Sequence, residues 1–428
     1  MALLGSAGAL GAVGCSASPV LQSTAARPSG SATVGTDVGA NAITATGAEE
    51  SLVADGPAPE SRFTPNGDRT LVVIELQGGN DGLATLQPID DGRIRSMRPD
   101  LGAPAGELID VGGGYGWHPN LAGMHALGLA GVVGIGSDEP DFSHFEMEQR
   151  WWRGDSGRRS RLGTGFFGRL CDQLDVGAPV TGLSLSGGPT PALLADKAVT
   201  VGLTDPGANW IFQEENPWIS TFRTAVAAMA APSASDGAAM GRARHGLDDM
   251  TSFSESIARM EPSDDQRYPW SELGQQLRFA NDVIALDAGV RVLHVRLGGF
   301  DTHVGQEWRH ADLLREVDES VTAFSQHLQE QGRWESTLVV TTSEFGRRVE
   351  QNDGGTDHGG ASTMLVCGAG LGGLHGDMPD LGALDDGNVV ATARFEDYYA
   401  TIAEEWFGVP VEEVLPSGGT SIAGLLRF

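Results

Sequence analysis

Short apolar segments of strand length alternate with helical segments along most of this chain, and this alternation limits the possible folds more than any other feature. The run LVVIEL at residues 71–76 predicts a buried strand that ends in a polar, glycine-rich loop. Comparable runs occupy residues 131–135, 181–185, 199–203, 292–297, 338–342 and 364–366. The pattern predicts an α/β fold with a mostly parallel central sheet and helices on both faces. In such sheets, functional residues lie on loops beyond the carboxyl ends of the strands.

The clearest helix is expected over about residues 307–330, where apolar side chains recur at steps of three and four residues and a glycine follows. Further helices are expected near residues 218–230 and 271–287. The intervening region, about residues 231–270, is rich in Ala, Ser, Asp and Met and is interpreted as a helical insertion. The expected folded part is a single domain over residues 67–428.

The N-terminal segment has the composition of an export signal. Residues 2–14 are small, uncharged and apolar, too short to span a bilayer, and lead into Cys15, although no positive residue precedes them. The sequence AVGC at residues 12–15 resembles a bacterial lipobox, in which Cys15 would carry a lipid anchor. Residues 1–15 are therefore interpreted as a signal or lipobox remnant, with an upstream start or no signal at all as alternatives. Residues 16–66, rich in Ser, Ala, Thr, Gly and Pro, are expected to form a disordered tether, and the protein is expected outside the cytoplasm, in the periplasm or at the cell surface.

The charge of the chain excludes one class of function. With 28 Lys+Arg against 57 Asp+Glu, the net charge is −29, so nucleic acid binding through net charge is excluded. Most of these carboxylates are expected on the solvated surface, and a minority could bind a hard cation. The three cysteines lack CxxC spacing, so neither a disulfide framework nor a structural zinc site is predicted.

Polar residues recur where the expected strands end. The sequence GGFDTH at residues 298–303 follows one strand, TSEFGRR at 342–348 ends the next, GGTDHGG at 354–360 precedes another, and Asn80-Asp81 follows the first. Taken alone, the Asp-x-His of residues 301–303 is more typical of a turn with a helix cap, but the repetition of polar residues at four strand ends predicts one shared polar site. The predicted metal ligands are Asp81, Asp301, His303, Glu344, Asp357 and His358.

The sequence DEPDFSHF at residues 138–145 lies between an expected strand and an amphipathic helix. Ser143 is interpreted either as a helix N-cap or as a functional residue, namely a metal-activated nucleophile or a group that binds an anion at the helix N-terminus. Arg347 could bind two oxygens of a tetrahedral oxyanion; pairing with a surface acid is the alternative, and it is favoured for Arg348. The predicted catalytic residues are Ser143, His144 and Arg347.

Other motifs are set aside. The sequence GAGLGG at residues 368–373 fits a dinucleotide fingerprint, but the residues that follow cannot form the required helix. No GxSxG, HExxH or GxxxxGK[ST] motif occurs. His118 and His125 are interpreted as structural residues.

In their order along the chain, these blocks resemble the DUF1501 family, a largely bacterial, exported group similar to the sulfatases and the alkaline phosphatase superfamily. The resemblance covers about residues 68–410 and rests on LVVIELQGGNDGLATLQP, HPNL, FSHFEMEQRWW, TGFFGRL, LGGFDTH, TTSEFGRR, GTDHGG and FEDYYATIAEEWFG. It implies a three-layer α/β/α sandwich like that of alkaline phosphatases. Members often carry a twin-arginine export signal, whose arginines are absent here.

The resemblance also implies a site. In the wider superfamily, a strand-end Asp and a Ser, Thr or modified Cys nucleophile lie over one or two divalent metals held by Asp and His. This places Asp81 near the first-strand Asp, Ser143 at the nucleophile, Asp301 and His303 at the first ligand pair, Glu344 at the next Asp and His358 at the late His. Two departures matter: Glu344-Phe345 stands where the superfamily usually has Asp-His, and no cysteine lies in the CxPxR context that is converted to formylglycine.

The function implied is a metal-dependent hydrolase of phosphate or sulfate esters, with zinc, manganese, calcium or magnesium as cofactor and a small-molecule or polymer ester as substrate. The Glu344-Phe345 departure favours an alternative, a catalytically degenerate binding or accessory protein at the cell surface with a protein partner.

Overall fold

A computed structural model describes residues 69–157, 162–174, 177–203, 217–233, 237–260, 263–368 and 371–426. The expected signal or lipobox with Cys15 and the expected tether lie outside these residues. Among the described residues, no helix combines the length and the apolar composition that crossing a membrane requires.

The core of the described chain is a central sheet in the strand order β13-β5-β12-β9-β1-β8-β6-β7, with β14 also paired to β5. The antiparallel strand β12 runs against both of its neighbours, and the other pairings in the sheet are parallel. The bounds are β1 Thr70–Leu76, β5 Ala130–Gly136, β6 Gly182–Ser184, β7 Thr200–Gly202, β8 Val292–Leu297, β9 Thr337–Thr342, β12 Ser362–Cys367, β13 Gly373–His375 and β14 Ala393–Arg394. The predicted mostly parallel α/β sheet is confirmed.

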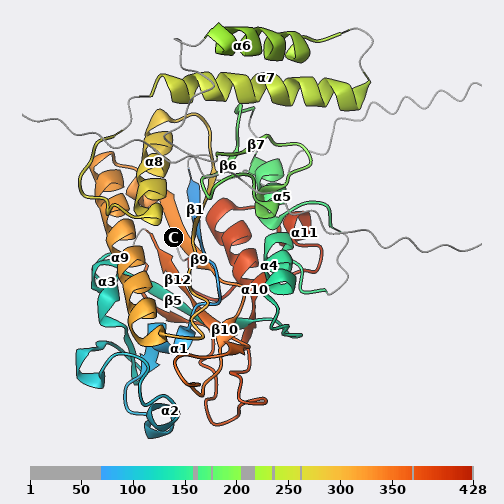
Figure 1. Ribbon diagram of the computed structural model, residues 1–428. Coiled ribbons are helices and arrows are strands. Elements are labelled where there is room, and N and C mark those ends of the chain that lie inside the picture. The colour runs from blue at the N-terminus through green and yellow to red at the C-terminus, as the bar shows by residue number, and fades with distance from the viewer. Residues whose placement is uncertain are drawn as a thin grey trace, which may run out of the picture. The chain divides into compact units, whose positions relative to one another are not determined.

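Helices cover both faces of this sheet (Figure 1). Alternate residues of β1 enter different cores: Leu71 and Val73 pack into one, and Val72 and Ile74 into the other. The first core also contains side chains of α4 His144–Arg153, α5 Phe166–Leu174, α10 Phe395–Thr401, the π-helix η6 Ile402–Phe407 and α11 Val411–Val414. The second contains side chains of α3 Ala122–Ala126, α8 Glu272–Leu286 and α9 Gln306–Glu330. The expected three-layer α/β/α sandwich is therefore confirmed.

Smaller elements complete the described chain. A three-stranded sheet consists of β2 Leu86–Pro88, β4 Tyr115–Trp117 and β3 Ile109–Gly112, and a two-stranded one of β10 Gly346–Arg347 and β11 His358–Gly359. The remaining helices are α1 Gly82–Thr85, α2 Gly92–Met97, α6 Pro217–Ala230, α7 Ala238–Ala258, η1 Ala105–Glu107, η2 Pro119–Leu121, η3 Pro191–Leu193 and η5 Trp334–Ser336. Helix α7 lies within the region expected as a helical insertion, and it runs beside α6 (Figure 1).

The topology brings three polar loops to one edge of the sheet. Strands β9, β1 and β8 are neighbours and run parallel, so the loops after Thr342, Leu76 and Leu297 leave from the same edge. The two-stranded sheet continues from one of these loops, and it pairs Arg347 with His358. Segments far apart in the sequence therefore meet beyond the carboxyl ends of the central strands.

Candidate metal centre

Asp301 lies in the loop after β8, where the backbone is tightly packed. Gly78, in the loop after β1, has φ +120°, and a Cβ atom built there would lie 2.2 Å from the backbone nitrogen of Asp301. Only glycine accommodates both this conformation and this approach. Gly78 is therefore needed to hold the Asp301 loop close to the loop after β1.

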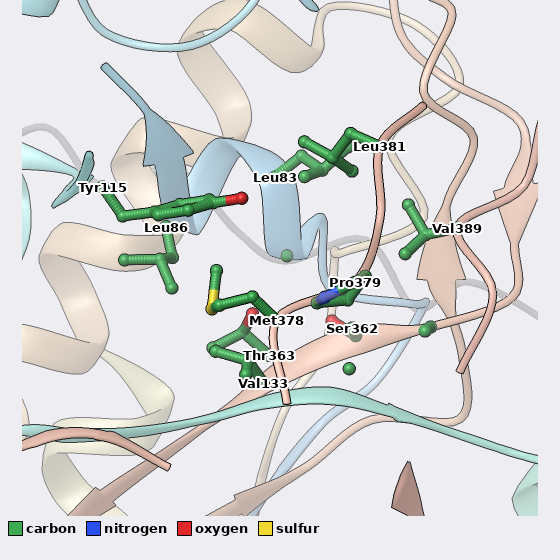
Figure 2. Close-up of a pocket in the computed structure, with 13 residues that line it drawn as sticks. Leu83, Leu86, Tyr115, Val133, Ser362, Thr363, Met378, Pro379, Leu381 and Val389 are labelled. Atoms are coloured by element: carbon green, nitrogen blue, oxygen red, sulfur yellow. The ribbon is translucent and has the colours of Figure 1, made fainter. Parts of the chain in front are cut away.

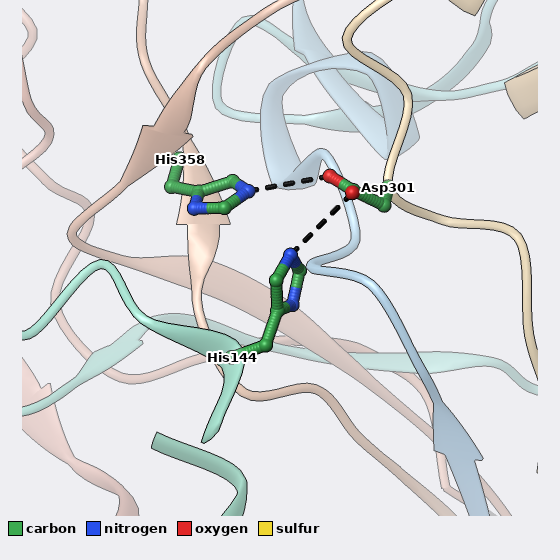
Figure 3. Close-up of side chains that lie close together, drawn as sticks. All are labelled: His144, Asp301 and His358. Carbon is green, nitrogen blue, oxygen red and sulfur yellow. Dashed lines mark hydrogen bonds and ion pairs between the residues drawn. The ribbon is translucent and has the colours of Figure 1, made fainter. Parts of the chain in front are cut away.

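Histidine side chains from three segments converge on Asp301. The Nε2 atoms of His303 and His358 lie 3.1 Å and 3.2 Å from Asp301 Oδ1, and 3.0 Å from each other. The Nε2 atom of His144 lies 3.5 Å from Asp301 Oδ2. Figure 3 shows His144 at the start of α4, His358 on β11 and Asp301 with their side chains turned toward one another. His144, Asp301 and His358 together meet the spacing expected of a metal-binding group.

The other nitrogen of each imidazole is held by an acceptor. His144 Nδ1 lies 2.8 Å from Glu344 Oε1, His303 Nδ1 lies 3.3 Å from Asp357 Oδ1, and His358 Nδ1 donates to the carbonyl oxygen of Phe142 at 2.7 Å. A carbonyl or carboxylate oxygen only accepts, so each Nδ1 carries the proton and each neutral ring keeps its lone pair on Nε2. This is how proteins usually orient metal-binding histidines.

The resulting arrangement fits a cation. Without one, the lone pairs of two imidazoles would face each other and an ionised carboxylate, which is electrostatically unfavourable. A divalent cation could be bound by His144, Asp301 and His358, whose ligand atoms lie within 4.8 Å of one another, with His303 Nε2 beside them at 3.1 Å from Asp301 Oδ1. The donor set of three imidazole nitrogens and a carboxylate therefore matches the chemistry of a metal centre.

The surroundings keep Asp301 ionised. Burial alone would raise the pKa of Asp301, but the hydrogen bond and the charge of Arg347, together with the neighbouring histidines, outweigh it and hold that pKa below its usual range. Burial lowers the pKa of His358, which favours the neutral ring. The hydrogen bond to Glu344, together with the charges of Glu344 and Asp301, raises the pKa of His144 against the effect of burial.

Glu344, predicted as a ligand, is buried behind His144. Its Oε1 accepts hydrogen bonds from the backbone nitrogen of Gly78 and from His144 Nδ1, both at 2.8 Å. Asp357 similarly faces the Nδ1 atom of His303. Both carboxylates thus act on the cluster through a histidine.

Asp81, also predicted as a ligand, has its carboxylate engaged elsewhere. It is the N-cap of α1, and its Oδ1 accepts from the backbone nitrogens of Leu83 and Ala84 at 3.1 Å. Its Oδ2 accepts from Arg98 at 2.7 Å and from Gln306. An Asp that directly precedes a short helix satisfies the free backbone N–H groups of the first turn, and this arrangement leaves Asp81 outside the histidine cluster.

Arg347 is buried, and backbone carbonyls of several loops surround its guanidinium. Nε donates to Gly79 O at 2.9 Å, Nη1 to Thr356 O at 3.0 Å, and Nη2 to Phe300 O and Asp301 Oδ1 at 2.9 Å. These contacts use the donors that an oxyanion would need. The role predicted for Arg347 in binding a substrate oxyanion therefore finds no support in its contacts, and its side chain instead fixes Asp301 relative to the loops.

Ser143 occupies the N-cap position of α4, in the extended conformation expected of a cap, but its side chain makes no cap hydrogen bond. Its residue is exposed, directly before His144. The nucleophile interpretation thus stays a prediction.

A solvent-facing pocket adjoins the cluster. It has a volume of about 310 Å³ and is lined by Phe142, His303, Arg348, Asp357, His358 and Asp386. The sequence favours a surface ion pair for Arg348, and no sequence motif indicates a role for Asp386 or Phe142. Their positions depend on contacts between segments that are distant along the chain.

A second, smaller cavity lies between α1, β5 and β12 (Figure 2). Its volume is about 30 Å³, and its lining includes Leu83, Leu86, Val133, Met378 and Leu381. No carboxylate, histidine, lysine or arginine belongs to this lining, so the cavity offers no ionic or metal-binding chemistry.

Comparison with known proteins gives one match to a protein family. The sequence model described as "Protein of unknown function (DUF1501)" matches residues 130–406, which is more than half of the chain. The chain belongs to the DUF1501 family. The DUF1501 match includes the clustered residues His144, Asp301, His303 and His358, whereas Asp81 precedes it.

Among solved structures, the chain is similar to a sulfatase from Pseudoalteromonas sp., with 13% identity, a TM-score of 0.40 and coverage of 84% of this chain and 72% of that one. It is also similar to a phosphonate monoester hydrolase from Silicibacter pomeroyi, with 12% identity, a TM-score of 0.39 and coverage of 84% and 76%. A protein in the alkaline phosphatase superfamily from Vibrio parahaemolyticus shows 11% identity, a TM-score of 0.35 and coverage of 80% and 67%. Comparison with curated protein sequences gives no significant match.

Proposed function

We propose that this protein is an extracytoplasmic, metal-dependent hydrolase of phosphate or sulfate esters. The observation that carries the proposal is the convergence of the Nε2 atoms of His144, His303 and His358 on the carboxylate of Asp301. Each imidazole is oriented by an acceptor on Nδ1. Such preorganisation is typical of a metal centre and has no evident purpose in a structural ion pair. The location outside the cytoplasm is inferred from residues 1–66 alone, as is a lipid anchor at Cys15.

The proposed metal ligands are His144, Asp301, His303 and His358. Imidazole nitrogens suit zinc and manganese better than calcium or magnesium, which prefer all-oxygen sites, so zinc or manganese is the cofactor proposed. A divalent ion held there would lower the pKa of a hydroxyl group or of water and would neutralise charge on an ester oxygen.

The protein's own groups supply orientation. Glu344, Asp357 and the carbonyl of Phe142 fix the three rings, and Arg347 fixes the carboxylate of Asp301. Ser143 is exposed at the start of α4 with its hydroxyl uncommitted to the helix cap. We propose Ser143 as the nucleophile that attacks the ester, with the substrate entering from the pocket beside His303 and His358.

The test is metal analysis of the purified full-length chain, followed by hydrolysis of aryl phosphate and aryl sulfate esters with and without a chelator. We expect about one zinc or manganese ion per chain and turnover that the chelator abolishes. His358→Ala should lose the metal, and Ser143→Ala should keep the metal but lose turnover. His125→Ala, a change at an exposed histidine, is the control and should behave as the wild type. A chain that binds no metal, or turnover indifferent to the chelator, would contradict the proposal.

One observation favours a second candidate, a metal-binding accessory protein without catalysis. The Phe345 ring lies 4.3 Å from the ring of His358 and 4.9 Å from that of His144, measured between centroids. This aromatic side chain occupies the flank of the cluster and offers no ligand for a second metal ion. Stoichiometric metal binding with no ester turnover, in the wild type as in Ser143→Ala, would support this candidate.

A further inference from the structure

Two consecutive arginines have opposite environments: Arg347 is the last residue of β10, and Arg348 directly follows it. The guanidinium of Arg347 is buried among loop carbonyls, whereas Arg348 belongs to the lining of the pocket beside His303 and His358. Arg348 is the one arginine or lysine among the residues that line the pocket of about 310 Å³ beside the metal centre. Its side chain is 35% exposed, so its guanidinium is accessible to a molecule in that pocket.

The backbone of Arg348 is held firmly in place. Its nitrogen donates to the carbonyl of Asp357 at 2.9 Å, and its carbonyl accepts from Arg98 Nη2 at 2.6 Å. The neighbouring Arg347 pairs with His358 across the two-stranded sheet. The position of Arg348 relative to the histidine cluster is therefore fixed by the same short sheet that carries His358.

The guanidinium of Arg348 contacts a carboxylate that a ligand can replace. Nη2 lies 2.9 Å from Asp386 Oδ2 and also donates to the Asp386 carbonyl. The side chain of Asp386 is 92% exposed. An exposed ion pair of this kind contributes little to stability, so exchanging the carboxylate for another oxyanion is energetically easy.

We propose that Arg348 binds the anionic group of the substrate, and that the carboxylate of Asp386 occupies Arg348 until the substrate displaces it. This inference rests on the proposed hydrolase function and names its substrate class. A guanidinium binds two oxygens of an oxyanion in parallel. Binding to the metal centre requires a third non-bridging oxygen of the same group. Three non-bridging oxygens are present in a phosphate or sulfate monoester, whereas a phosphodiester has two. The structure therefore assigns monoesters as the preferred substrates.

Two variants of the full-length protein should change anion affinity in opposite directions. With inorganic phosphate and inorganic sulfate as the probes in calorimetry, Arg348→Gln should weaken binding by about 10- to 100-fold, since a charge-assisted hydrogen bond contributes about 1.5–3 kcal/mol. Asp386→Asn should strengthen binding several-fold, because it removes the competing carboxylate. Asn tolerates the backbone of this position, which has φ +45°. Arg315→Gln, at an exposed arginine of α9 paired with Asp312, is the matched control and should leave the affinity unchanged.

Metal content, measured on the same samples, separates this inference from the proposed function. If every variant holds metal and Arg348→Gln binds phosphate as tightly as the wild type, the assignment of Arg348 is overturned and the metal centre stands. A loss of affinity in Asp386→Asn would overturn the competing role of that carboxylate. If the variants shift anion affinity in the expected directions but no metal binds and no ester is cleaved, Arg348 is an anion site and the hydrolase proposal fails. Equal kcat/KM for monoesters and diesters would overturn the substrate class.

Discussion

Glu344 controls the histidine cluster without facing its centre. Because its Oε1 accepts from both Gly78 N and His144 Nδ1, this one atom joins the loop after β1 to the start of α4. Glu344→Gln keeps an acceptor oxygen but loses the negative charge that stabilises His144 as a ligand. We expect zinc affinity to fall by about 10- to 100-fold, the usual effect of losing a group that supports a ligand.

Calorimetric titration with zinc, alongside a thermal unfolding curve, measures this effect. Glu148→Gln is the matched control, because Glu148 is a half-buried carboxylate on α4, the helix that begins at His144. Glu148 accepts a hydrogen bond from Gln77 and contacts none of the clustered histidines through a hydrogen bond. Unchanged zinc affinity in Glu344→Gln would show that His144 needs no support from this carboxylate, or is not a ligand.

His118 predicts a pH dependence of stability. Its Nδ1 accepts a hydrogen bond from the backbone nitrogen of Asn120 at 3.2 Å, which only an unprotonated Nδ1 can do, and burial lowers the pKa of His118 to about 4. The unfolded chain, with the ordinary pKa of 6.5, then binds protons more readily than the folded one between pH 6.5 and pH 4. The contribution of the neutral His118 side chain to the free energy of unfolding is fully present above pH 6.5 and is lost as the pH falls toward 4.

We expect this loss to reach about 1–3 kcal/mol for His118. His118→Asn keeps an N-cap acceptor that does not titrate, so its free energy of unfolding should fall less between pH 7 and pH 4. Urea unfolding at several pH values measures the difference, with His125→Asn as the exposed control. Parallel curves for His118→Asn and the wild type would contradict the prediction.

At the scale of elements, β1 carries a buried charge in an otherwise apolar strand. Glu75 Oε2 lies 3.0 Å from His294 Nε2 and 3.1 Å from Arg296 Nη2, both on β8, and Glu75 Oε1 accepts from Trp152 of α4 at 3.1 Å. Burial alone would raise the pKa of Glu75, but His294 and Arg296 outweigh it and lower the pKa. The sheet therefore depends on these partners to keep a carboxylate in its interior.

Removing one partner should cost more than removing both charges. His294→Leu leaves the buried Glu75 short of a partner and should lower the free energy of unfolding by about 3–5 kcal/mol. The double variant Glu75→Gln/His294→Leu should recover part of this loss, because no carboxylate then remains to be solvated. Urea unfolding of both variants tests this. A double variant less stable than His294→Leu would show that Glu75 is stabilising without His294.

The sequence predicts elements well where the signal is local. Helix α9, Gln306–Glu330, begins within one residue of the expected start because its apolar spacing repeats over many turns. Asp81 shows where prediction from local sequence fails. An Asp in a loop after a strand has the same local sequence pattern whether it caps a short helix or binds a metal. Arg347 and Arg348 are equally ambiguous, because their environments depend on the two-residue strand that ends at Arg347 and on its pairing with β11. The sequence predicts both His144 and Glu344 as site residues, but their contact joins α4 to the loop after β9 and cannot be inferred from spacing.

At the scale of the whole molecule, the net charge of −29 and an anionic substrate oppose each other. Long-range repulsion slows the approach of an anion, and salt screens this repulsion over a Debye length of about 10 Å at 0.1 M. We therefore expect kcat/KM for an aryl phosphate monoester to rise several-fold from about 10 mM to about 200 mM NaCl.

Arg348 acts in the opposite direction at short range, since it lies in the pocket and attracts the same anion. In Arg348→Gln the long-range repulsion remains without this attraction, so the relative rise of kcat/KM with salt should be larger than in the wild type. Steady-state kinetics of both proteins at matched ionic strength measures the two slopes. A fall of kcat/KM with salt in the wild type would show that the local field of the metal centre and Arg348 exceeds that of the acidic surface. The surplus carboxylates would then serve solubility and leave substrate capture to the pocket.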